Sequence, residues 1–324
     1  MAIVFIGTPA FAVPALQRVV AAGYEVSAVF TQPDRPAGRG RMSTAPVVKA
    51  AAEELGLPVY QPASLKDGAV IDQIRAIAPE LIVGVAYGQL IVPQVLAIPP
   101  KGVLNVHPSL LPRWRGASPV AAAIVAGDEE TGVTIMLMDE GLDSGAILSQ
   151  TVRAVSDTDT SGSLTEVLAE KGADLLADTL PRWLAGEIDP QPQDESRATV
   201  CRRLRKADGL IDWTQPATEI WRKVRAYNPW PGAHSSLDGA VLSLWSVWPL
   251  EVESGEPPGT VVAAPDSLPA GAESAAFAVH FAVQTGHGAL AVLEAQRAGR
   301  RSLGSAELLR GMPDLIGRRF SVPE

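Results

Sequence analysis

Asn105 and His107 are of residue types, and at a spacing, that could stabilise a developing negative charge. They stand two positions apart in GVLNVHP, an apolar, β-branched run that is typical of a buried strand. Because side chains alternate across a strand, both should project from the same face. Pro108 has no N–H group and should end the strand directly after His107. An amide donor and an imidazole that can be protonated near neutral pH would then lie together, where they could hold an oxyanion.

A carboxylate that could complete this group lies in the acidic turn DEGLDSG, which two strand-like runs flank. Asp143 sits in this turn directly before Ser144 and Gly145. Beside His107, its carboxylate would orient the imidazole and raise the pKa of His107 towards the charged form. Spacing alone leaves the ordinary alternative open. In it the Asn and His side chains at the strand end are hydrogen-bonded within the fold, and Asp143 serves only the turn.

The elements that must position these side chains alternate between strands and helices. The runs AIVFIG, EVSAVFTQ, LPVYQP, LIVGVAYG and GVLNVH are strand-like, and Ala- and Leu-rich helical patterns separate them. This alternation predicts an α/β domain with a Rossmann-like, mostly parallel sheet, which binds ligands at the carboxyl ends of its strands. The first turn, GTPAFA, has only Gly7 of the three glycines in a dinucleotide fingerprint, so we expect no dinucleotide.

Length and composition predict more than one domain. The chain has 324 residues, of which 47% are hydrophobic, and single cores rarely keep growing beyond about 250 to 300 residues. We predict a catalytic domain over residues 1–189, a proline-rich polar linker over 190–207 and a smaller C-terminal domain over 208–324. Short β-like runs separated by Gly and Pro predict a small β-barrel in this last part.

Cysteine content and hydrophobic patterning exclude several classes of protein. The single cysteine, Cys201, rules out an internal disulfide, and no His, Cys and Asp residues cluster at metal-ligand spacing. The N-terminus lacks the basic region and cleavage site of a signal peptide. Residues 81–100 are uncharged and long enough to cross a bilayer, but Pro93, Pro99 and Pro100 interrupt them. We therefore expect a cytoplasmic protein that holds no metal and does not span a membrane.

Charge is unevenly distributed. The net charge of −9 argues against sequence-independent binding to DNA or to anionic membranes, so we expect neither as a partner. Residues 197–235, however, contain eight basic and three acidic residues. The loop QPDRPAGRGRMSTAP carries Arg35, Arg39 and Arg41 against Asp34 alone. A local basic surface on an acidic protein is typical of a binder that contacts phosphates in one place, although solvated surface charge is the ordinary alternative.

Two consecutive motifs carry a family resemblance. The run NVHPSLLPRWRGASP, followed by TGVTIMLMDEGLDSG, resembles the signature of formyltransferases that use 10-formyltetrahydrofolate. In that family the catalytic Asn, His and Asp fall on Asn105, His107 and Asp143. The resemblance implies that the folate is held by the backbone of Ser109, Leu110, Leu111 and Pro112. Three further stretches, GTPAFAVPAL, FTQPDRPAGRG and NPWPGA, resemble the branch of this family whose acceptor is initiator methionyl-tRNA.

The resemblance implies a reaction in which the α-amine of the methionyl group attacks the formyl carbon. Asn105 and a protonated His107 would stabilise the oxyanion, while Asp143 keeps His107 charged. It also implies that the C-terminal barrel is OB-like and binds the tRNA. The implied tRNA contacts are Arg35, Arg39, Arg41, Arg203, Arg205, Lys206, Arg222, Lys223 and Arg225.

Two other functions remain open. HPSLLP and the acidic turn are shared with folate formyltransferases that act on glycinamide ribonucleotide or a nucleotide sugar, but the arginine loop and the basic C-terminal region weigh against these substrates. A non-catalytic RNA-binding protein on the same fold is the second alternative, and the intact Asn105, His107 and Asp143 weigh against it.

Overall fold

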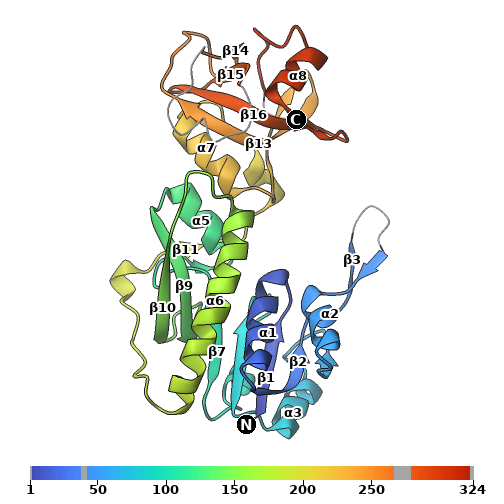
Figure 1. The fold of residues 1–324 in the computed structure, drawn as a ribbon, viewed down its shortest axis with the longest axis vertical. Coiled ribbons are helices and arrows are strands. Elements are labelled where there is room, and N and C mark those ends of the chain that lie inside the picture. The colour runs from blue at the N-terminus through green and yellow to red at the C-terminus, as the bar shows by residue number, and fades with distance from the viewer. Residues whose placement is uncertain (1, 38–41, 266–278, 322–324) are drawn as a thin grey trace. The chain divides into compact units, whose positions relative to one another are not determined.

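A computed structural model describes residues 2–37, 42–265 and 279–321 of the chain, which forms two compact units (Figure 1). The first unit consists of Met1–Pro119, Glu130–Ala154 and Leu164–Arg202, and the second of Val120–Glu129, Val155–Ser163 and Arg203–Glu324. The segment predicted as a linker, residues 190–207, is therefore divided after Arg202. Its greater part belongs to the first unit.

The first unit combines a large sheet with flanking helices and two small pairs of strands. Its strands are β1 (Ala2–Gly7), β2 (Glu25–Phe30), β3 (Arg35–Ala37), β4 (Met42–Thr44), β5 (Val59–Tyr60), β6 (Leu81–Val85), β7 (Val103–His107), β8 (Arg115–Gly116), β9 (Glu130–Leu137), β10 (Ile147–Ala154) and β11 (Val200–Cys201). Its helices are α1 (Val13–Ala21), α2 (Val47–Glu54), α3 (Gly68–Ile77), α4 (Pro93–Leu96) and most of α6 (Ser161–Leu184), with short 3₁₀ helices η1 (Ala10–Ala12) and η2 (Glu195–Arg197).

The large sheet has the Rossmann-like order that the strand and helix alternation predicts. Its seven strands follow the order β10-β9-β7-β6-β1-β2-β5. The strands β5, β2, β1, β6 and β7 are parallel to one another, and β9 pairs antiparallel with both of its neighbours, β7 and β10. The chain runs outward from β1 first to β5 and then, on the other side, to β7. Such a reversal of strand order opens a crevice at the carboxyl ends of the strands, where ligands of these folds bind.

Two glycines let helical segments approach this sheet closely. A Cβ atom on Gly7 would lie 2.9 Å from Cβ of Ala12, so only glycine allows the end of β1 to meet η1. A Cβ on Gly172 would lie 2.8 Å from Cγ1 of Val106, so α6 packs directly on β7, along which it runs in Figure 1. The uncharged run over residues 81–100 forms β6 and α4. No helix within the described residues is long and apolar enough to cross a membrane.

The second unit is built on an antiparallel sheet. Its strands are β12 (Ala233–Leu237), β13 (Ala240–Leu250), β14 (Val261–Ala263), β15 (Phe281–Gln284), β16 (Ala289–Arg297) and β17 (Ser302–Gly304), and its helices are η3 (Lys206–Gly209), α7 (Ala217–Ala226), α8 (Ser305–Gly311) and nearly all of α5 (Pro119–Ala126). The strand order is β12-β13-β16-β15-β14, with β17 also on β16. Isolated bridges from Ser321 to Ser236 and from Arg319 to Thr260 bring the two edges of the sheet together, which gives the predicted small barrel.

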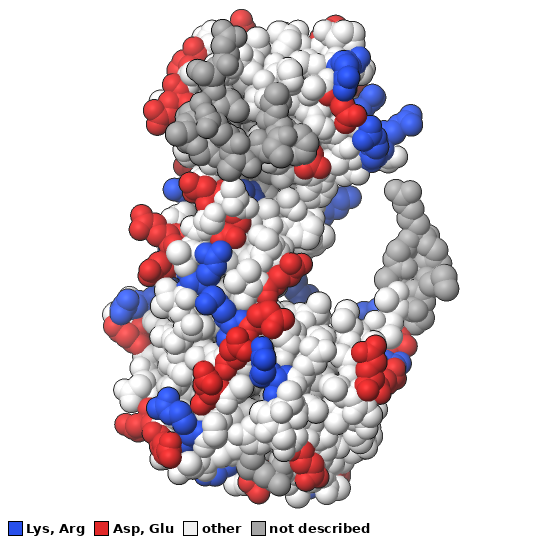
Figure 2. Space-filling view, viewed as in Figure 1, with Lys and Arg blue, Asp and Glu red and all other residues white. Residues whose placement is uncertain are grey.

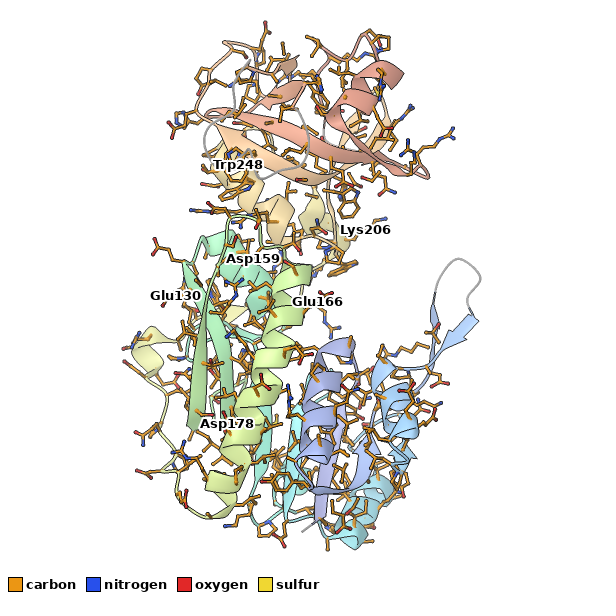
Figure 3. The ribbon with its side chains drawn as sticks, viewed as in Figure 1. Glu130, Asp159, Glu166, Asp178, Lys206 and Trp248 are labelled. Atoms are coloured by element: carbon orange, nitrogen blue, oxygen red, sulfur yellow. The ribbon has the colours of Figure 1, made fainter. Side chains whose placement is uncertain are left out.

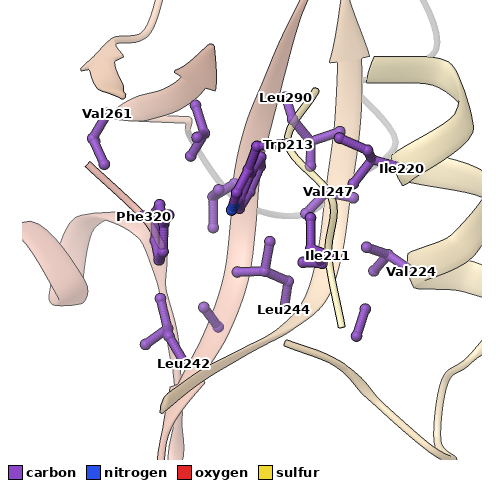
Figure 4. Close-up of a cluster of buried hydrophobic side chains, with 14 of the residues drawn as sticks. Ile211, Trp213, Ile220, Val224, Leu242, Leu244, Val247, Val261, Leu290 and Phe320 are labelled. Atoms are coloured by element: carbon purple, nitrogen blue, oxygen red, sulfur yellow. The ribbon is translucent and has the colours of Figure 1, made fainter. Parts of the chain in front are cut away.

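A large apolar cluster fills this barrel (Figure 4). The rings of Trp213 and Phe320 lie 5.2 Å apart between centroids, and the Trp213 indole donates a hydrogen bond to Oγ of Ser235. Ile220 and Val224, one turn apart on α7, complete the cluster from the helix. Barrel and helix therefore share one core.

Candidate active site

The carboxyl end of β7 presents Asn105 and His107 on one face of the sheet. In register, Asn105 lies opposite Gly84 of β6 and Met136 of β9, and pairing ends at His107 opposite Thr134. His107 is buried, whereas Asn105 is only half-buried. Within the described part of the chain the Asn105 carboxamide forms no hydrogen bond, so its N–H groups are available to a ligand.

The contacts of His107 define its protonation state. Nε2 lies 3.0 Å from the carbonyl oxygen of Trp114, an acceptor, so Nε2 carries a proton. Nδ1 faces Oδ2 of Asp143 at 3.7 Å, which is longer than a hydrogen bond. Burial lowers the pKa of His107, although the charge of Asp143 and the bond to Trp114 oppose this shift. Asp143 acts on the pKa of His107 in the predicted direction, but the net shift is downward, because desolvation of a ring that is 5% exposed outweighs a carboxylate at this distance.

The carboxylate of Asp143 is held by a backbone amide two residues after Trp114, whose carbonyl bonds to His107. Its Oδ2 accepts a hydrogen bond of 2.8 Å from the amide of Gly116, and its backbone adopts a left-handed φ of 50°. Trp114 and Gly116 flank Arg115, so β8 and the residue directly before it contact both the imidazole and the carboxylate. Within the residues described, no group of His, Cys, Asp and Glu side chains is arranged to hold a metal ion.

The segment Gln191–Cys201, which we call the strap, is bonded to this site and is not a free linker. Its strand β11 pairs in parallel with β8. The Thr199 carbonyl accepts from the amide of Arg115 at 2.9 Å, and the Thr199 hydroxyl accepts from the amide of Trp114 at 2.9 Å. At the other end, Gln191 exchanges two backbone hydrogen bonds with Ile147. The polar composition that predicted a linker reflects these bonds to the backbone of the first unit.

The predicted folate-binding residues follow His107 in an internally bonded loop. The Thr134 hydroxyl donates to the carbonyl of Ser109 at 2.7 Å and accepts from the amide of Leu111 at 3.1 Å. The carbonyl of Pro112 accepts from the strap. Among the amides of this loop, only that of Leu110 has no partner within the described residues. Backbone binding of a folate by this loop therefore depends on Leu110 and remains a prediction.

The arginine loop is only partly described. Arg35 is exposed at the start of β3, whereas Arg39 and Arg41 lie outside the described residues. Asp34, the one acid of this loop, lies 3.2 Å from Nζ of Lys49 on α2. Its charge is thus offset by a lysine outside the loop.

The predicted tRNA contacts of the second unit differ in exposure. Arg203, Arg205 and Lys206 are exposed around the start of η3, where Figure 3 labels Lys206, and Arg222 and Lys223 are half-buried on α7.

Arg225 does not fit the role predicted for it. Its side chain is buried, and its guanidinium carbon lies 3.9 Å from the ring centroid of Trp221. It donates to the carbonyls of Ser156, at 2.7 Å, and Asp159, at 3.4 Å, on the loop that Figure 3 marks at Asp159. Burial and these two bonds, both from Nη1, weigh against the predicted contact of Arg225 with tRNA.

Two groups of residues were missed in the sequence. Arg297, Arg300 and Arg301 are exposed at the β16–β17 hairpin, where Figure 2 shows basic side chains gathered on the face in view. Their signal, RAGRR, is visible in the sequence but lies beyond residue 235, where the basic stretch was taken to end. Arg115 and Gln193 were also missed. They are bonded to each other across 78 residues, which no local pattern indicates.

Comparison with known proteins identifies the family. The family described as Formyl transferase matches residues 1–180, and the one described as Formyl transferase, C-terminal domain, matches residues 203–313. The methionyl-tRNA formyltransferase of Chloroflexus aurantiacus is 48% identical over 312 residues, covering 96% of this chain and 97% of that protein. That of Methylococcus capsulatus is 43% identical over 322 residues, covering 99% of this chain and 100% of that protein.

Solved structures share the fold. HypX from Aquifex aeolicus in complex with tetrahydrofolic acid superposes with a TM-score of 0.63 at 20% identity, covering 95% of this chain and 46% of that chain. An N-formyltransferase from Helicobacter canadensis, in complex with folinic acid and dTDP-3-aminofucose, gives 0.63 at 16% identity, covering 91% and 98%. These likenesses show the fold alone. With both family domains matched and sequence relatives aligned over nearly the whole chain, the protein is a formyltransferase and belongs to the methionyl-tRNA formyltransferase family.

Proposed function

We propose that this chain transfers the formyl group of 10-formyltetrahydrofolate to the α-amino group of initiator methionyl-tRNA. The product would be the N-formylmethionyl-tRNA that begins bacterial translation in the cytoplasm. The observation that carries the proposal is the pair Asn105 and His107 at the carboxyl end of β7, with the Asp143 carboxylate 3.7 Å from Nδ1 of His107. These residues belong to a chain that is 48% identical to a methionyl-tRNA formyltransferase.

His107 is suited to accept the proton that the amine loses as it bonds to the formyl carbon. Because Nε2 carries a proton and the pKa is lowered, the resting imidazole has a lone pair on Nδ1. A proton arriving at Nδ1 would face the carboxylate of Asp143, which stabilises the imidazolium. As the bond to N10 breaks, His107 can return that proton to N10, so protons balance over the cycle. The sequence favoured a histidine charged from the outset, and this geometry favours a base.

Asn105 is suited to stabilise charge on oxygen. Its carboxamide has no internal partner in the described structure and can donate to the formyl oxygen as negative charge develops there. The amide of Leu110, three residues beyond His107, is the backbone donor that the neighbouring loop offers to the folate.

Phosphate contacts of the tRNA are assigned to the basic residues that remain accessible. In the second unit these are Arg203, Arg205 and Lys206, with Arg222 and Lys223 less exposed. In the first unit Arg35 is exposed, and Arg39 and Arg41, which lie outside the described residues, are assigned from the sequence alone. The guanidinium fork suits both phosphates and base edges.

A direct assay tests the proposal. The full chain is incubated with 10-formyltetrahydrofolate and, in parallel, initiator methionyl-tRNA, elongator methionyl-tRNA, glycinamide ribonucleotide or an amino-sugar nucleotide. We expect formylmethionine only from the initiator tRNA. Formylation of a small acceptor instead of tRNA would support the first alternative, and tRNA binding without transfer would support the second.

Substitutions in the site test the roles within this reaction. Asn105→Ala, His107→Gln and Asp143→Asn should each lower turnover by about 10²- to 10⁴-fold, the range for losing an oxyanion donor or a proton-transfer group. Circular dichroism should show each variant folded. A folded variant with near wild-type turnover would remove the role assigned to that residue.

A further inference from the structure

We propose that Gln193 of the strap, held by Arg115, is a positioning residue that fixes the turn carrying Asp143 at the correct place beside His107. This inference rests on the proposed function, because it assumes that His107 and Asp143 react as a pair. It assigns to a segment between the two matched family domains a part in the chemistry of the first.

Both ends of the Gln193 carboxamide are fully used. Its Nε2 donates to the carbonyl of Asp143 at 2.8 Å and to the carbonyl of Gly145 at 2.7 Å. Its Oε1 accepts from Nε and Nη2 of Arg115 at 3.0 and 2.8 Å. A guanidinium only donates and carbonyls only accept, so just one orientation of the amide satisfies all four bonds. The carboxamide therefore links the turn to Arg115 in a defined geometry.

Arg115 provides a rigid support for Gln193. Its side chain is only 8% exposed, and its two terminal nitrogens bond to the two carboxylate oxygens of Glu195 at 2.9 and 2.7 Å. The bond to Glu195 raises the pKa of Arg115 above its usual value despite partial burial. Such a planar, two-point pair fixes direction as well as distance.

The same arginine lies between the two backbone groups that touch the reacting side chains. The carbonyl of Trp114 accepts from His107, and the amide of Gly116 donates to Asp143. Through its side chain and Gln193, Arg115 also reaches the backbone of Asp143. The imidazole of His107 and the carboxylate of Asp143 thus bond to the two neighbours of Arg115, and the turn bonds to Arg115 through Gln193.

The turn needs such a support, because its own contacts do not set its distance from His107. Asp143 has a left-handed φ of 50°, and such a conformation costs a residue other than glycine about 1 kcal/mol or more. Leu142 is 60% exposed, so its side chain adds little packing that could hold the turn. The hydroxyl of Ser144 bonds to Asp139, which shapes the turn from within. Within the described residues, Gln193 and Gly116 tie the Asp143 end of the turn to the strap and to β8, and the carbonyl of Trp114, directly before β8, bonds to His107.

Two variants and a matched control test the proposal in the full chain. Gln193→Ala removes all four bonds, whereas Gln193→Glu keeps an acceptor for Arg115 but replaces the donor to the turn by a carboxylate oxygen, which the carbonyls of Asp143 and Gly145 repel. Gln191→Ala is the control, because Gln191 is exposed and, among the described residues, its side chain bonds only to the carbonyl of Asp189, two positions earlier. We expect kcat to fall about 10- to 100-fold in both Gln193 variants, with KM for folate and tRNA within about twofold, and the control to match the wild type.

A second measurement is independent of activity. The four histidines can be followed by NMR titration, and the signal that disappears in His107→Gln identifies His107. The groups that act on its ionisation are the Asp143 carboxylate, the Trp114 carbonyl and burial, and Asp143 in turn faces Arg115. In Gln193→Ala the pKa of His107 should fall further, because the carboxylate that raises it is no longer held close.

Each outcome decides the proposal. Unchanged kcat in Gln193→Ala overturns it. A reduced kcat with an unchanged His107 titration also overturns it, because the activity would then be lost without any movement of Asp143 relative to His107. A similar loss of kcat in Gln191→Ala also overturns it. If the wild type transfers no formyl group, the proposed function fails, and the titration alone then decides whether Gln193 positions Asp143.

Discussion

The regions around Arg115 and Arg225 solve the same problem, a buried guanidinium, in different ways. Arg115 is 7% and Arg225 9% exposed. Arg115 meets a carboxylate and an amide oxygen, and its pKa is raised by the bond to Glu195. Among the described residues, Arg225 bonds to backbone carbonyls and lies over the face of Trp221, while its Nε finds no partner there; burial lowers its pKa.

The difference teaches that a guanidinium bonded through all three of its nitrogens, as in Arg115, specifies geometry, whereas one bonded through a single nitrogen, as in Arg225, mainly fills space and joins backbone segments. Arg115 bonds to Gln193, which in turn bonds to the backbone of Asp143, one of the proposed reacting residues. Those of Arg225 reach the carbonyls of Ser156 and Asp159, which precede α6. We therefore expect changes at Arg115 to alter turnover and changes at Arg225 to alter stability.

The largest effect in this comparison should come from Arg115→Met. Gln193 and Glu195 would both lose their partner, and a misplacement of about 1 Å in reacting groups can cost about 10²-fold in rate. We expect kcat to fall by about that factor, while Arg225→Met stays within about threefold of the wild type. Arg115→Lys, which keeps the charge but not the fork, should lie between them. Equal turnover in Arg115→Met and Arg225→Met would remove the distinction.

The next effect concerns tRNA affinity. Replacing Arg203, Arg205 and Lys206 together by Ala should weaken tRNA binding and flatten its dependence on salt. The slope of log K against log salt should change by up to about 0.9 for each phosphate that the variant no longer neutralises. Arg225→Met should leave the slope unchanged, because its guanidinium is bonded inside the second unit. Binding titrations at several salt concentrations measure both slopes, and a flattened slope in Arg225→Met would restore it to the tRNA contacts.

A smaller effect is expected in the stability of α7. Arg225→Met leaves the carbonyls of Ser156 and Asp159 without their donor, which should lower the free energy of local opening by about 1 to 3 kcal/mol. Hydrogen exchange of the α7 amides measures this opening in the full chain. Lys223→Met, at a half-buried position two residues earlier, is the control and should change it by less than about 0.5 kcal/mol. Greater protection in Arg225→Met would show that the desolvated charge costs more than its bonds contribute.

The smallest effect is a dependence on pH that only the Arg115 region should show. Burial holds the pKa of His107 below its unfolded value of about 6.5. The unfolded chain therefore binds this proton first, so the stability gained from a neutral buried His107 is complete above about pH 6.5 and is lost as pH falls through the folded pKa. Hydrogen exchange of the β7 amides should weaken more between pH 7 and 5 in the wild type than in His107→Gln. Identical profiles would contradict a lowered pKa.

The sequence predicts what depends on local periodicity. Alternation in GVLNVHP is sufficient to put Asn105 and His107 on one face, and the repeat of strands and helices is sufficient for the sheet. The same reasoning, carried further, would have found Arg225. It stands four residues after Trp221 and one after Val224, on the buried face of α7, whereas Arg222 and Lys223 are only half-buried.

The rest depends on contacts between distant segments. The ionisation of His107 is set by burial and by a carboxylate 36 positions later, whose net effect cannot be weighed without distances. The role of Gln193 depends on carbonyls about 50 residues earlier in the chain. Composition alone made its segment resemble a linker, because bonds to a neighbouring backbone require the same polar residues as solvent exposure does.

The position of the strap has a consequence for the design of chimaeric proteins that combine domains of two relatives. The matched domains end at residue 180 and begin again at 203, so a chimaera designed on their limits would treat 181–202 as neutral joining sequence. A junction near residue 189 would separate Gln193 of one parent from the Asp143 turn and Arg115 of the other, although every assigned catalytic residue would be retained. A junction after Arg202 inherits all three from one parent. For swapping acceptor specificity, the modular boundary of this enzyme therefore lies after the strap.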